Sequence, residues 1–133
     1  VAAELSRRGW IASISLRNTR GIDILVTNAE ASRSVTIQCK TNQTSKATWI
    51  LHEKSETFVS TSHFYIFVVL GGSLERPRYY IVPSRDVAEH IRQDHARWLS
   101  ELGRGGRPHT DNSIRKFEDR DGKYLEQWSL LGL

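Results

Sequence analysis

Three polar residues, Asp23, Gln38 and Lys40, lie in two short stretches whose apolar residues alternate with polar ones. A carboxylate and a neutral amide oxygen are ligands that suit a hard cation such as Mg²⁺. A nearby lysine can orient or help to deprotonate a water molecule, or offset the charge of a phosphoryl group. Together, these residue types indicate metal-assisted hydrolysis of a phosphodiester. The alternative is that they form the solvated face of an ordinary pair of strands.

Two predicted strands carry these residues. Hydrophobic and β-branched residues recur at every second position in residues 22–27 and again in residues 35–40. This period of two is typical of strands that turn one face to a core. The loop 28–33 between them is short and polar, so the strands are expected to pair as an antiparallel hairpin. A slip of one residue would turn one strand's apolar side chains away from the core, so the pattern itself resists a change of register.

The register of this hairpin decides whether the polar side chains meet. If Thr27 lies opposite Ser34, then Asp23 lies opposite Gln38 on the same face, with Cβ atoms about 5 Å apart. Lys40 follows Gln38 by two residues, so it shares that face and lies about 7 Å further along the strand. We therefore expect one carboxylate, one amide and one ammonium group to converge on a single patch.

Length and composition indicate one globular domain. The chain has 133 residues, of which 38% are hydrophobic and 26% charged, as in ordinary soluble proteins. Its net charge of +4 is compatible with a polyanionic partner. The single cysteine excludes an intramolecular disulfide and a multi-cysteine zinc site, and it favours a reducing, intracellular setting. The longest apolar run, Phe64–Leu70, is far too short to span a bilayer, and residues 1–9 show no secretory signal pattern, so no membrane association is expected.

The remaining elements follow from the same patterns. Strands are expected at residues 10–16, 49–51, 64–70 and 78–82, and helices at residues 1–8, 84–102 and 123–131. The continuous apolar run is typical of a central strand covered on both faces, and Ser84 is a good candidate to cap the N-terminus of its helix. We therefore predict a mixed α/β sandwich, with a central sheet of about five strands flanked by helices. Its core should occupy about residues 1–102, and 103–133 should form an irregular tail with a closing helix.

Several further residues are candidates for contact with nucleic acid. Two arginines stand in the turn beside Asp23, a lysine and a tryptophan follow Lys40, and two arginines lie in the glycine-rich loop after residue 102. Basic side chains near an aromatic ring suit a phosphate backbone and its bases. Each has an ordinary alternative, which is a solvated loop for the basic residues and a core position for the tryptophan. The candidates are Arg17, Arg20, Lys46, Trp49, Arg104 and Arg107.

The motifs of this chain resemble the PD-(D/E)xK nuclease superfamily. The resemblance rests on Gly-Ile-Asp at residues 21–23, on Gln-Cys-Lys at 38–40, and on the order of the expected helices and strands. Gln38, in place of the second acidic residue, resembles the Mrr-type branch, in which Gln-x-Lys is common. The stretch 80–88 is similar to a group of uncharacterised bacterial proteins built on the same core. The resemblance implies the restriction-endonuclease-like three-layer sandwich, here as a single domain over residues 1–133.

The resemblance also implies an activity, a divalent-metal-dependent nuclease acting on DNA in a prokaryotic cytoplasm. Asp23 would be the anchoring ligand of Mg²⁺ or of Mn²⁺ as its substitute, Gln38 would replace the second acid, and the backbone carbonyl of Cys39 would also coordinate. Lys40 would position the attacking water. Glu4 is the candidate in this chain for the glutamate that the family often adds from its first helix. A homodimer is compatible with this activity, because cutting both strands of a duplex usually needs two active sites.

Two other functions remain open at this point. One is a domain that keeps the fold and binds nucleic acid without cleaving it, and the other is a protein-interaction domain on the same fold. The neutral Gln38 keeps both open, since an amide brings no negative charge to a cation.

Overall fold

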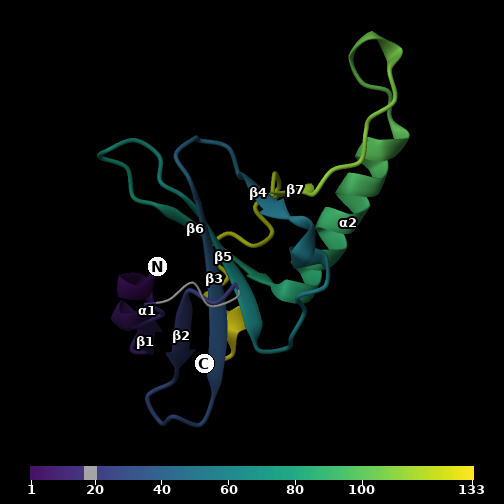
Figure 1. Cartoon of the computed structure of the whole chain (residues 1–133). Coiled ribbons are helices and arrows are strands. Elements are labelled where there is room, and N and C mark those ends of the chain that lie inside the picture. Colours follow the sequence, from purple (N-terminus) through teal and green to yellow (C-terminus); the bar gives the residue numbers. More distant parts are fainter. Residues whose placement is uncertain (17–20) are drawn as a thin grey trace.

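The computed structural model describes residues 1–16 and 21–133. In that part of the chain the strands form two sheets, and α-helices lie on either side of the larger one (Figure 1). The strands of the main sheet are β1 (Ile11–Ile14), β2 (Ile24–Thr27), β3 (Ser34–Asn42), β5 (His63–Val69) and β6 (Arg78–Pro83). The other elements are β4 (Thr48–His52), β7 (Ile114–Glu118), α1 (Ala2–Arg7), α2 (Ser84–Ser100) and the 3-10 turns η1 (Glu53–Glu56), η2 (Arg104–Gly106) and η3 (Trp128–Leu131).

The main sheet is mixed, with the strand order β1-β2-β3-β5-β6. Strands β3 and β5 run parallel, and the other neighbours pair antiparallel. A parallel pair needs a crossover between its strands, and here β4 and η1 supply it. The predicted five-stranded mixed sheet is therefore confirmed.

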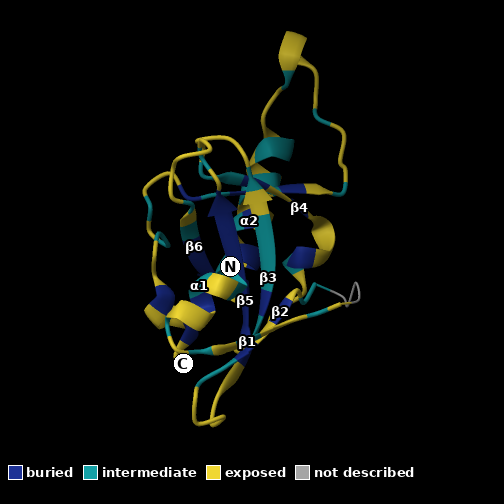
Figure 2. Cartoon of the chain, turned by 90° about the vertical axis from the view of Figure 1, so that its left-hand side faces the viewer, coloured by how far each residue is buried: buried dark blue, intermediate teal, exposed yellow. Residues whose placement is uncertain are grey.

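Strand β5 lies between β3 and β6 in the sheet and is buried along its whole length. Its alternate residues point into two different hydrophobic cores, with Phe64 and Ile66 in one and Tyr65 and Phe67 in the other. Figure 2 shows β5 as the dark blue strand at the heart of the molecule. The continuous apolar run therefore marks a strand covered on both faces, as predicted.

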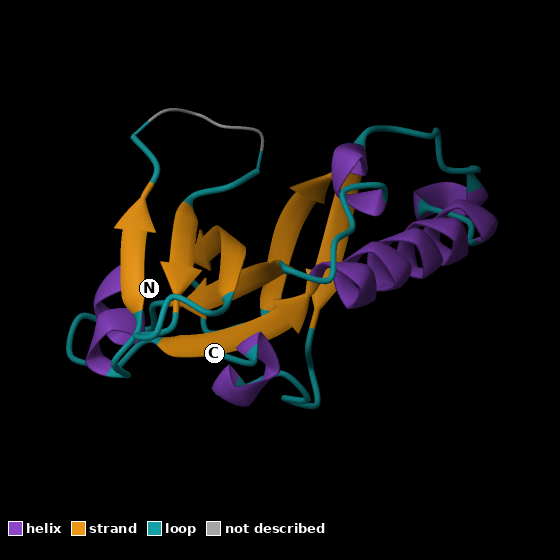
Figure 3. Cartoon of the chain, turned by 90° about the horizontal axis from the view of Figure 1, so that it is seen from below, coloured by secondary structure: helices purple, strands orange, loops and turns teal. Residues whose placement is uncertain are grey.

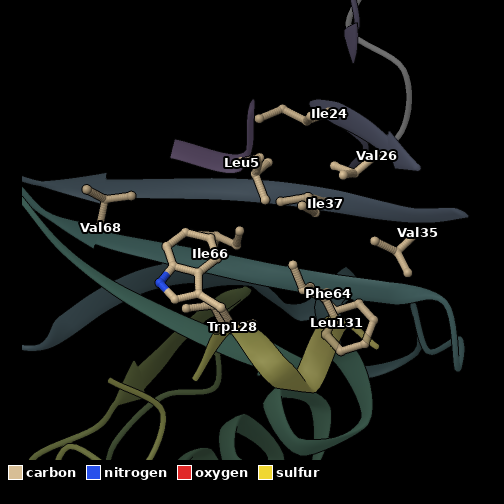
Figure 4. Close-up of a cluster of buried hydrophobic side chains, with 11 residues drawn as sticks. Leu5, Ile24, Val26, Val35, Ile37, Phe64, Ile66, Val68, Trp128 and Leu131 are labelled. Carbon is tan, nitrogen blue, oxygen red and sulfur yellow. The ribbon is translucent and has the colours of Figure 1, made fainter. Parts of the chain in front are cut away.

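Each face of the sheet is covered by its own layer. On one face, Leu5 of α1 and Trp128 and Leu131 of η3 complete the first core with residues of β2, β3 and β5 (Figure 4). On the other face, Val87 of α2 packs with Trp49 of β4 and Phe117 of β7 to form the second core. Figure 3 shows α1 and α2 on opposite sides of the strands. The three-layer arrangement follows from these two cores.

The C-terminal part of the chain differs from the prediction. The expected closing helix at 123–131 is wrong, because only the short turn η3 is helical there and residues 124–126 run along the edge of β6. The limit of the core at residue 102 is also wrong, because β7 and η3 contribute buried residues to both cores. Strand β7 was not predicted, and it pairs with β4 in a separate two-stranded sheet.

The start of α2 also differs from the prediction. Pro83 occupies the N-cap position, and Ser84 is the first residue of the helix. The Ser84 hydroxyl donates to the backbone oxygen of Ser60 at 2.9 Å and accepts from the Ser60 N–H at 3.0 Å. Ser84 therefore fixes the loop before β5 to the helix and does not cap it. None of the helices in the described residues is both long enough and apolar enough to cross a membrane.

Candidate active site

The hairpin of β2 and β3 has the register that the sequence predicts. Thr27 lies opposite Ser34, and the ladder continues to Ile24 opposite Ile37. Beyond that point the pairing changes, because the N–H of Asp23 donates to the backbone oxygen of Ile37 at 2.8 Å. The last regular pair of the ladder therefore lies immediately before the residues expected to form the site.

The Asp23 carboxylate completes the hydrogen bonding at this end of the ladder. Its Oδ2 atom accepts the backbone N–H of Cys39 at 2.7 Å, so the carboxylate lies against the peptide that joins Gln38 to Cys39. The side chain is exposed, and no described residue donates a hydrogen bond to its other oxygen, Oδ1. One carboxylate oxygen thus holds the strand, and the other is accessible to a ligand.

Gln38 is held next to the loop that leads into β2. Gly21 adopts a left-handed conformation with φ +70°, and a Cβ atom at this position would lie 3.3 Å from Oε1 of Gln38. Glycine is therefore needed both for the backbone conformation and for the close approach. Because Asp23 follows Gly21 by two residues, the structure brings Asp23 and Gln38 to the same end of the hairpin.

Lys40 lies on the same side of β3 as Gln38, and both line a cavity of about 610 Å³. The cavity continues over the crossover segment that contains the end of β4 and η1. Its walls combine apolar and cationic side chains, and none of the described residues that line it is acidic. Besides Gln38 and Lys40, these residues are Gly21, Leu51, His52, Lys54, Ser55, Thr57, Phe58 and Tyr65. Asp23 does not line this cavity. Its carboxylate accepts the N–H of Cys39 at the end of the β2–β3 ladder.

Two titratable groups close to Asp23, His63 and Cys39, are uncharged at neutral pH. Burial lowers the pKa of His63 to about 4, although the negative charge of Asp23 opposes this shift. Burial and, to a lesser extent, the negative charge of Asp23 raise the pKa of the Cys39 thiol to about 11. Among the described residues, Asp23 forms no ion pair.

His63 and Tyr65 place two buried polar atoms without partners on this side of β5. Nδ1 of His63 lies 2.8 Å from the Thr36 hydroxyl, but its Nε2 has no hydrogen-bond partner in the described structure. The Tyr65 hydroxyl has none either. Burial raises the pKa of Tyr65. The nearby Ser55 hydroxyl lowers this pKa in part, although the two hydroxyl groups are not positioned for a hydrogen bond.

The oxygen donors near the end of the hairpin are of the kind that a hard cation prefers, although they are few. Within residues 1–16 and 21–133, no three His, Cys, Asp or Glu side chains converge so as to hold a metal ion. The donors that remain are the Asp23 carboxylate, the Gln38 amide oxygen and the Cys39 carbonyl. Mg²⁺ commonly binds one or two carboxylates and completes its shell with water and substrate phosphates. A site of this kind therefore suits a cation that arrives with, or is completed by, a phosphate.

Glu4, the candidate metal ligand from the first helix, forms ion pairs with arginines. Its Oε1 atom lies 2.7 Å from Arg7, 3.1 Å from Arg8 and 3.4 Å from Arg76. The hydrogen bond from Arg7 is the main cause that lowers the Glu4 pKa. Arg8 in turn packs over the ring of Trp128 at 4.4 Å. This network ties α1 to η3 on the first core. A role of Glu4 as a metal ligand stays a prediction, and the site described above does not require it.

The candidates for nucleic-acid contact have different locations. The prediction that Trp49 contacts nucleic acid is wrong. The residue is 2% exposed and its indole N–H donates to the backbone oxygen of Val68, so its ring belongs to the second core. Lys46 is exposed on the turn between β3 and β4. Arg104 and Arg107 are exposed on the loop after α2 (Figure 1). None of these three basic residues lines the cavity. Arg17 and Arg20 lie outside the described residues.

The sequence reasoning did not identify the residues that form the cavity beside Lys40. Tyr65 was assigned to the central strand only, and Lys54 and Phe58 to a loop or short helix. The sequence signal for Lys54 was weak, since residues 52–62 are polar throughout apart from Phe58 and Val59. The parallel pairing of β3 with β5 and the path of the crossover bring these residues to Lys40, and no local pattern shows either feature.

Comparisons with known proteins support the fold. No protein-family model and no curated protein sequence matches the chain. A solved bacterial homing endonuclease is similar over 98% of this chain and 82% of its own, with 16% sequence identity and a TM-score of 0.52. A Holliday junction resolvase from the archaeal hyperthermophile Archaeoglobus fulgidus aligns over 89% of this chain and 77% of its own, with 11% identity and a TM-score of 0.48. The likeness to the homing endonuclease shows that the chain has an endonuclease-like fold, and it confirms the restriction-endonuclease-like architecture that the sequence predicts.

Proposed function

We propose that this chain is a divalent-metal-dependent nuclease that hydrolyses DNA phosphodiester bonds. The observation that carries this proposal is the position of the Asp23 carboxylate, which binds the N–H of Cys39 beside Gln38 and leaves one oxygen accessible. Lys40 follows on the same face of β3 and lines the adjacent cavity. The endonuclease-like fold supports this assignment. We also propose that this nuclease belongs to the Mrr-type branch, in which Gln replaces the second acidic residue.

The oxygen donors would hold Mg²⁺, or Mn²⁺ in its place. Asp23 supplies the negative charge, Gln38 supplies a neutral amide oxygen, and the Cys39 carbonyl supplies a third donor. A bound divalent cation would polarise a phosphate oxygen and lower the pKa of a water molecule. With only one carboxylate, the protein binds the cation weakly on its own, and DNA phosphates complete the shell.

Lys40 acts on the substrate side of the site. Its ammonium group lies beside a cavity that contains a second lysine, Lys54, and, among the described residues, no acidic side chain. The two positive charges attract the DNA backbone, and the Lys40 ammonium offsets the negative charge that develops on the phosphate in the transition state. Lys46 and the exposed Arg104 and Arg107 extend the positive surface further from the site.

A second candidate function is DNA binding without cleavage. One observation favours it, namely that Glu4 is bound by three arginines and is not free to add a second carboxylate. This candidate predicts DNA binding that depends on salt and survives the replacement of Asp23.

Cleavage assays with matched variants test the proposal. The wild type, Lys40→Ala and Glu30→Gln would be incubated with supercoiled, single-stranded and branched DNA in Mg²⁺ or Mn²⁺. Glu30 is exposed in the loop between β2 and β3 and does not line the cavity, so its variant is a control for replacement of a charged surface residue away from the site. We expect cleavage by the wild type and by Glu30→Gln, and its loss in Lys40→Ala. Intact DNA in all reactions, despite measurable binding, would favour the second candidate.

The homodimer expectation is tested in the same experiments. If two copies act together on a duplex, light scattering shows a dimer on DNA and cleavage yields linear molecules directly. A monomer that only nicks duplex DNA would contradict it.

A further inference from the structure

The cavity next to Lys40 combines features that one small ligand class would use together. Phe58 and Tyr65 contribute aromatic rings, Leu51 contributes an apolar side chain, and Lys40 and Lys54 contribute positive charge. None of the described lining residues is acidic. Ligands that pair a flat, mostly apolar ring with a phosphate match such a surface, and its volume of about 610 Å³ lies in the range of small-molecule sites.

The Tyr65 hydroxyl is an unsatisfied group in the wall of this cavity. The Tyr65 side chain is fully buried, and its hydroxyl has no hydrogen-bond partner in the described structure. Buried hydroxyl groups are nearly always bonded, and here the nearby Ser55 hydroxyl is the polar group that the chain places beside this atom, without a hydrogen bond between them. A carbonyl or ring nitrogen of a bound molecule would supply that hydrogen bond.

Phe58 is the accessible aromatic residue of the cavity. Its side chain is 39% exposed, which is high for a large apolar residue. Its ring makes a T-shaped contact with the ring of His63, with the centroids 4.6 Å apart, and the exposed fraction shows that part of Phe58 stays accessible beside this contact. Gly21 lies beside it, since a Cβ there would be 3.5 Å from the ring. An accessible aromatic ring beside lysines is the usual way in which proteins hold an unstacked base.

We propose that this cavity binds one unstacked nucleotide of the DNA, next to the phosphate that is cut. The base would lie on Phe58 with a polar edge toward the Tyr65 hydroxyl, and the lysines would hold its phosphate. This inference rests on the proposed function, because it takes DNA to run past Lys40. The preferred substrates would then carry an unpaired nucleotide, as in a bulge, a flap or a frayed end, because such a base costs least to unstack.

Binding measured in EDTA tests this inference separately from catalysis. Three labelled duplexes of equal length would be compared by fluorescence anisotropy. One carries a single unpaired thymidine, one carries an abasic spacer at that position, and one is fully paired. We expect the unpaired thymidine to increase the affinity at least about fivefold over the abasic spacer, as base–aromatic stacking does elsewhere.

Two variants and a matched control locate the effect. Phe58→Ala should remove the preference for the thymidine, and Tyr65→Phe should reduce it by removing only the hydroxyl. Val59→Ala should keep it, because Val59 is the next residue, is 41% exposed and does not line the cavity. Circular dichroism confirms that each variant is folded.

Equal binding of the three duplexes, no binding to any of them, or equal preferences in Phe58→Ala and Val59→Ala would overturn the inference. A thymidine preference that depends on Phe58 in a protein that cuts no DNA would support the cavity and refute the nuclease. DNA cleavage by a protein that shows no preference for the unpaired thymidine would support the nuclease and refute the proposed role of the cavity.

Discussion

Replacing Asp23 by asparagine separates its chemical role from its structural one. Asparagine keeps a side-chain oxygen that can accept the N–H of Cys39, but it removes the negative charge from the proposed cation site. We expect the free energy of unfolding to change by less than about 0.5 kcal/mol, as for most exposed substitutions. Cleavage should fall by about 100-fold or more, because loss of one stabilising charge or donor typically costs this much.

Replacing Asp23 by alanine removes both roles. The hydrogen bond of 2.7 Å to Cys39 is lost, and bonds to charged groups contribute about 1.5–3 kcal/mol where water is excluded. Because Asp23 is exposed, water can replace part of this bond. We therefore expect Asp23→Ala to lower the free energy of unfolding by about 1 kcal/mol and to lose activity as completely as Asp23→Asn does.

Urea denaturation and plasmid nicking in a Mn²⁺ titration measure the two effects. A charge that matters for the cation should make the residual activity of Asp23→Asn recover only at higher Mn²⁺. Two results would refute the reasoning. One is an asparagine variant whose activity stays within about threefold of the wild type. The other is an asparagine variant that is destabilised as much as alanine, which would mean that the charge, and not the acceptor, holds the strand.

Four further perturbations follow from the structure. Lys40→Ala should lower kcat by about 100-fold without a change of Tm, and Lys40→Arg should restore part of it; equal losses in both would argue against a role of the positive charge. Gly21→Ala should cost about 1 kcal/mol of stability, since φ is +70° and the new Cβ would crowd Gln38, and it should also reduce cleavage; a wild-type nicking rate would contradict this. Burial lowers the pKa of His63 to about 4, so between about pH 6.5 and pH 4 the unfolded chain binds a proton that the folded protein excludes, and stability falls on acidification. Between pH 7 and pH 5 the wild type should thereby lose about 2 kcal/mol more than His63→Gln in urea titrations, and parallel losses would disprove the assignment. Trp128→Ala should destabilise the protein by about 3–5 kcal/mol in the same assay, and a loss below about 1 kcal/mol would show that η3 does not complete the first core.

The hairpin that carries the site could be predicted because its determinants are local. The apolar alternation on both strands and the short polar loop allow only one register that buries both sets of side chains, and the structure has that register. The central strand could be predicted for a similar reason, since a seven-residue apolar run has few other structures available.

Strand β7 could not be predicted because its partners are remote in sequence. Its two buried residues are Arg115 and Phe117, and a buried arginine disguises the strand pattern. Arg115 is acceptable there because it forms an ion pair with Glu56 of η1, 59 residues away, and donates to the backbone oxygens of Asn112 and Ile114. Burial of the arginine thus depends on tertiary structure that the sequence does not show locally.

The prediction of a closing helix was wrong because tertiary contacts override the local preference for a helix. Tyr124, Trp128 and Leu131 have helical spacing, but the backbone of Tyr124 and Glu126 bonds to the edge of β6. Glu126 also has a positive φ of 54°, which a helix does not tolerate. Covering an exposed sheet edge outweighs the local preference for a helix.

The late position of η3 and β7 in the chain has a consequence for synthesis. A chain that is still emerging from the ribosome can pair β2 with β3, but it cannot complete either core until Phe117, Trp128 and Leu131 have been added. Domains fold as units during translation, so the β2–β3 hairpin that carries Asp23 and Lys40 should become fully stable only after residues 114–131 have been made.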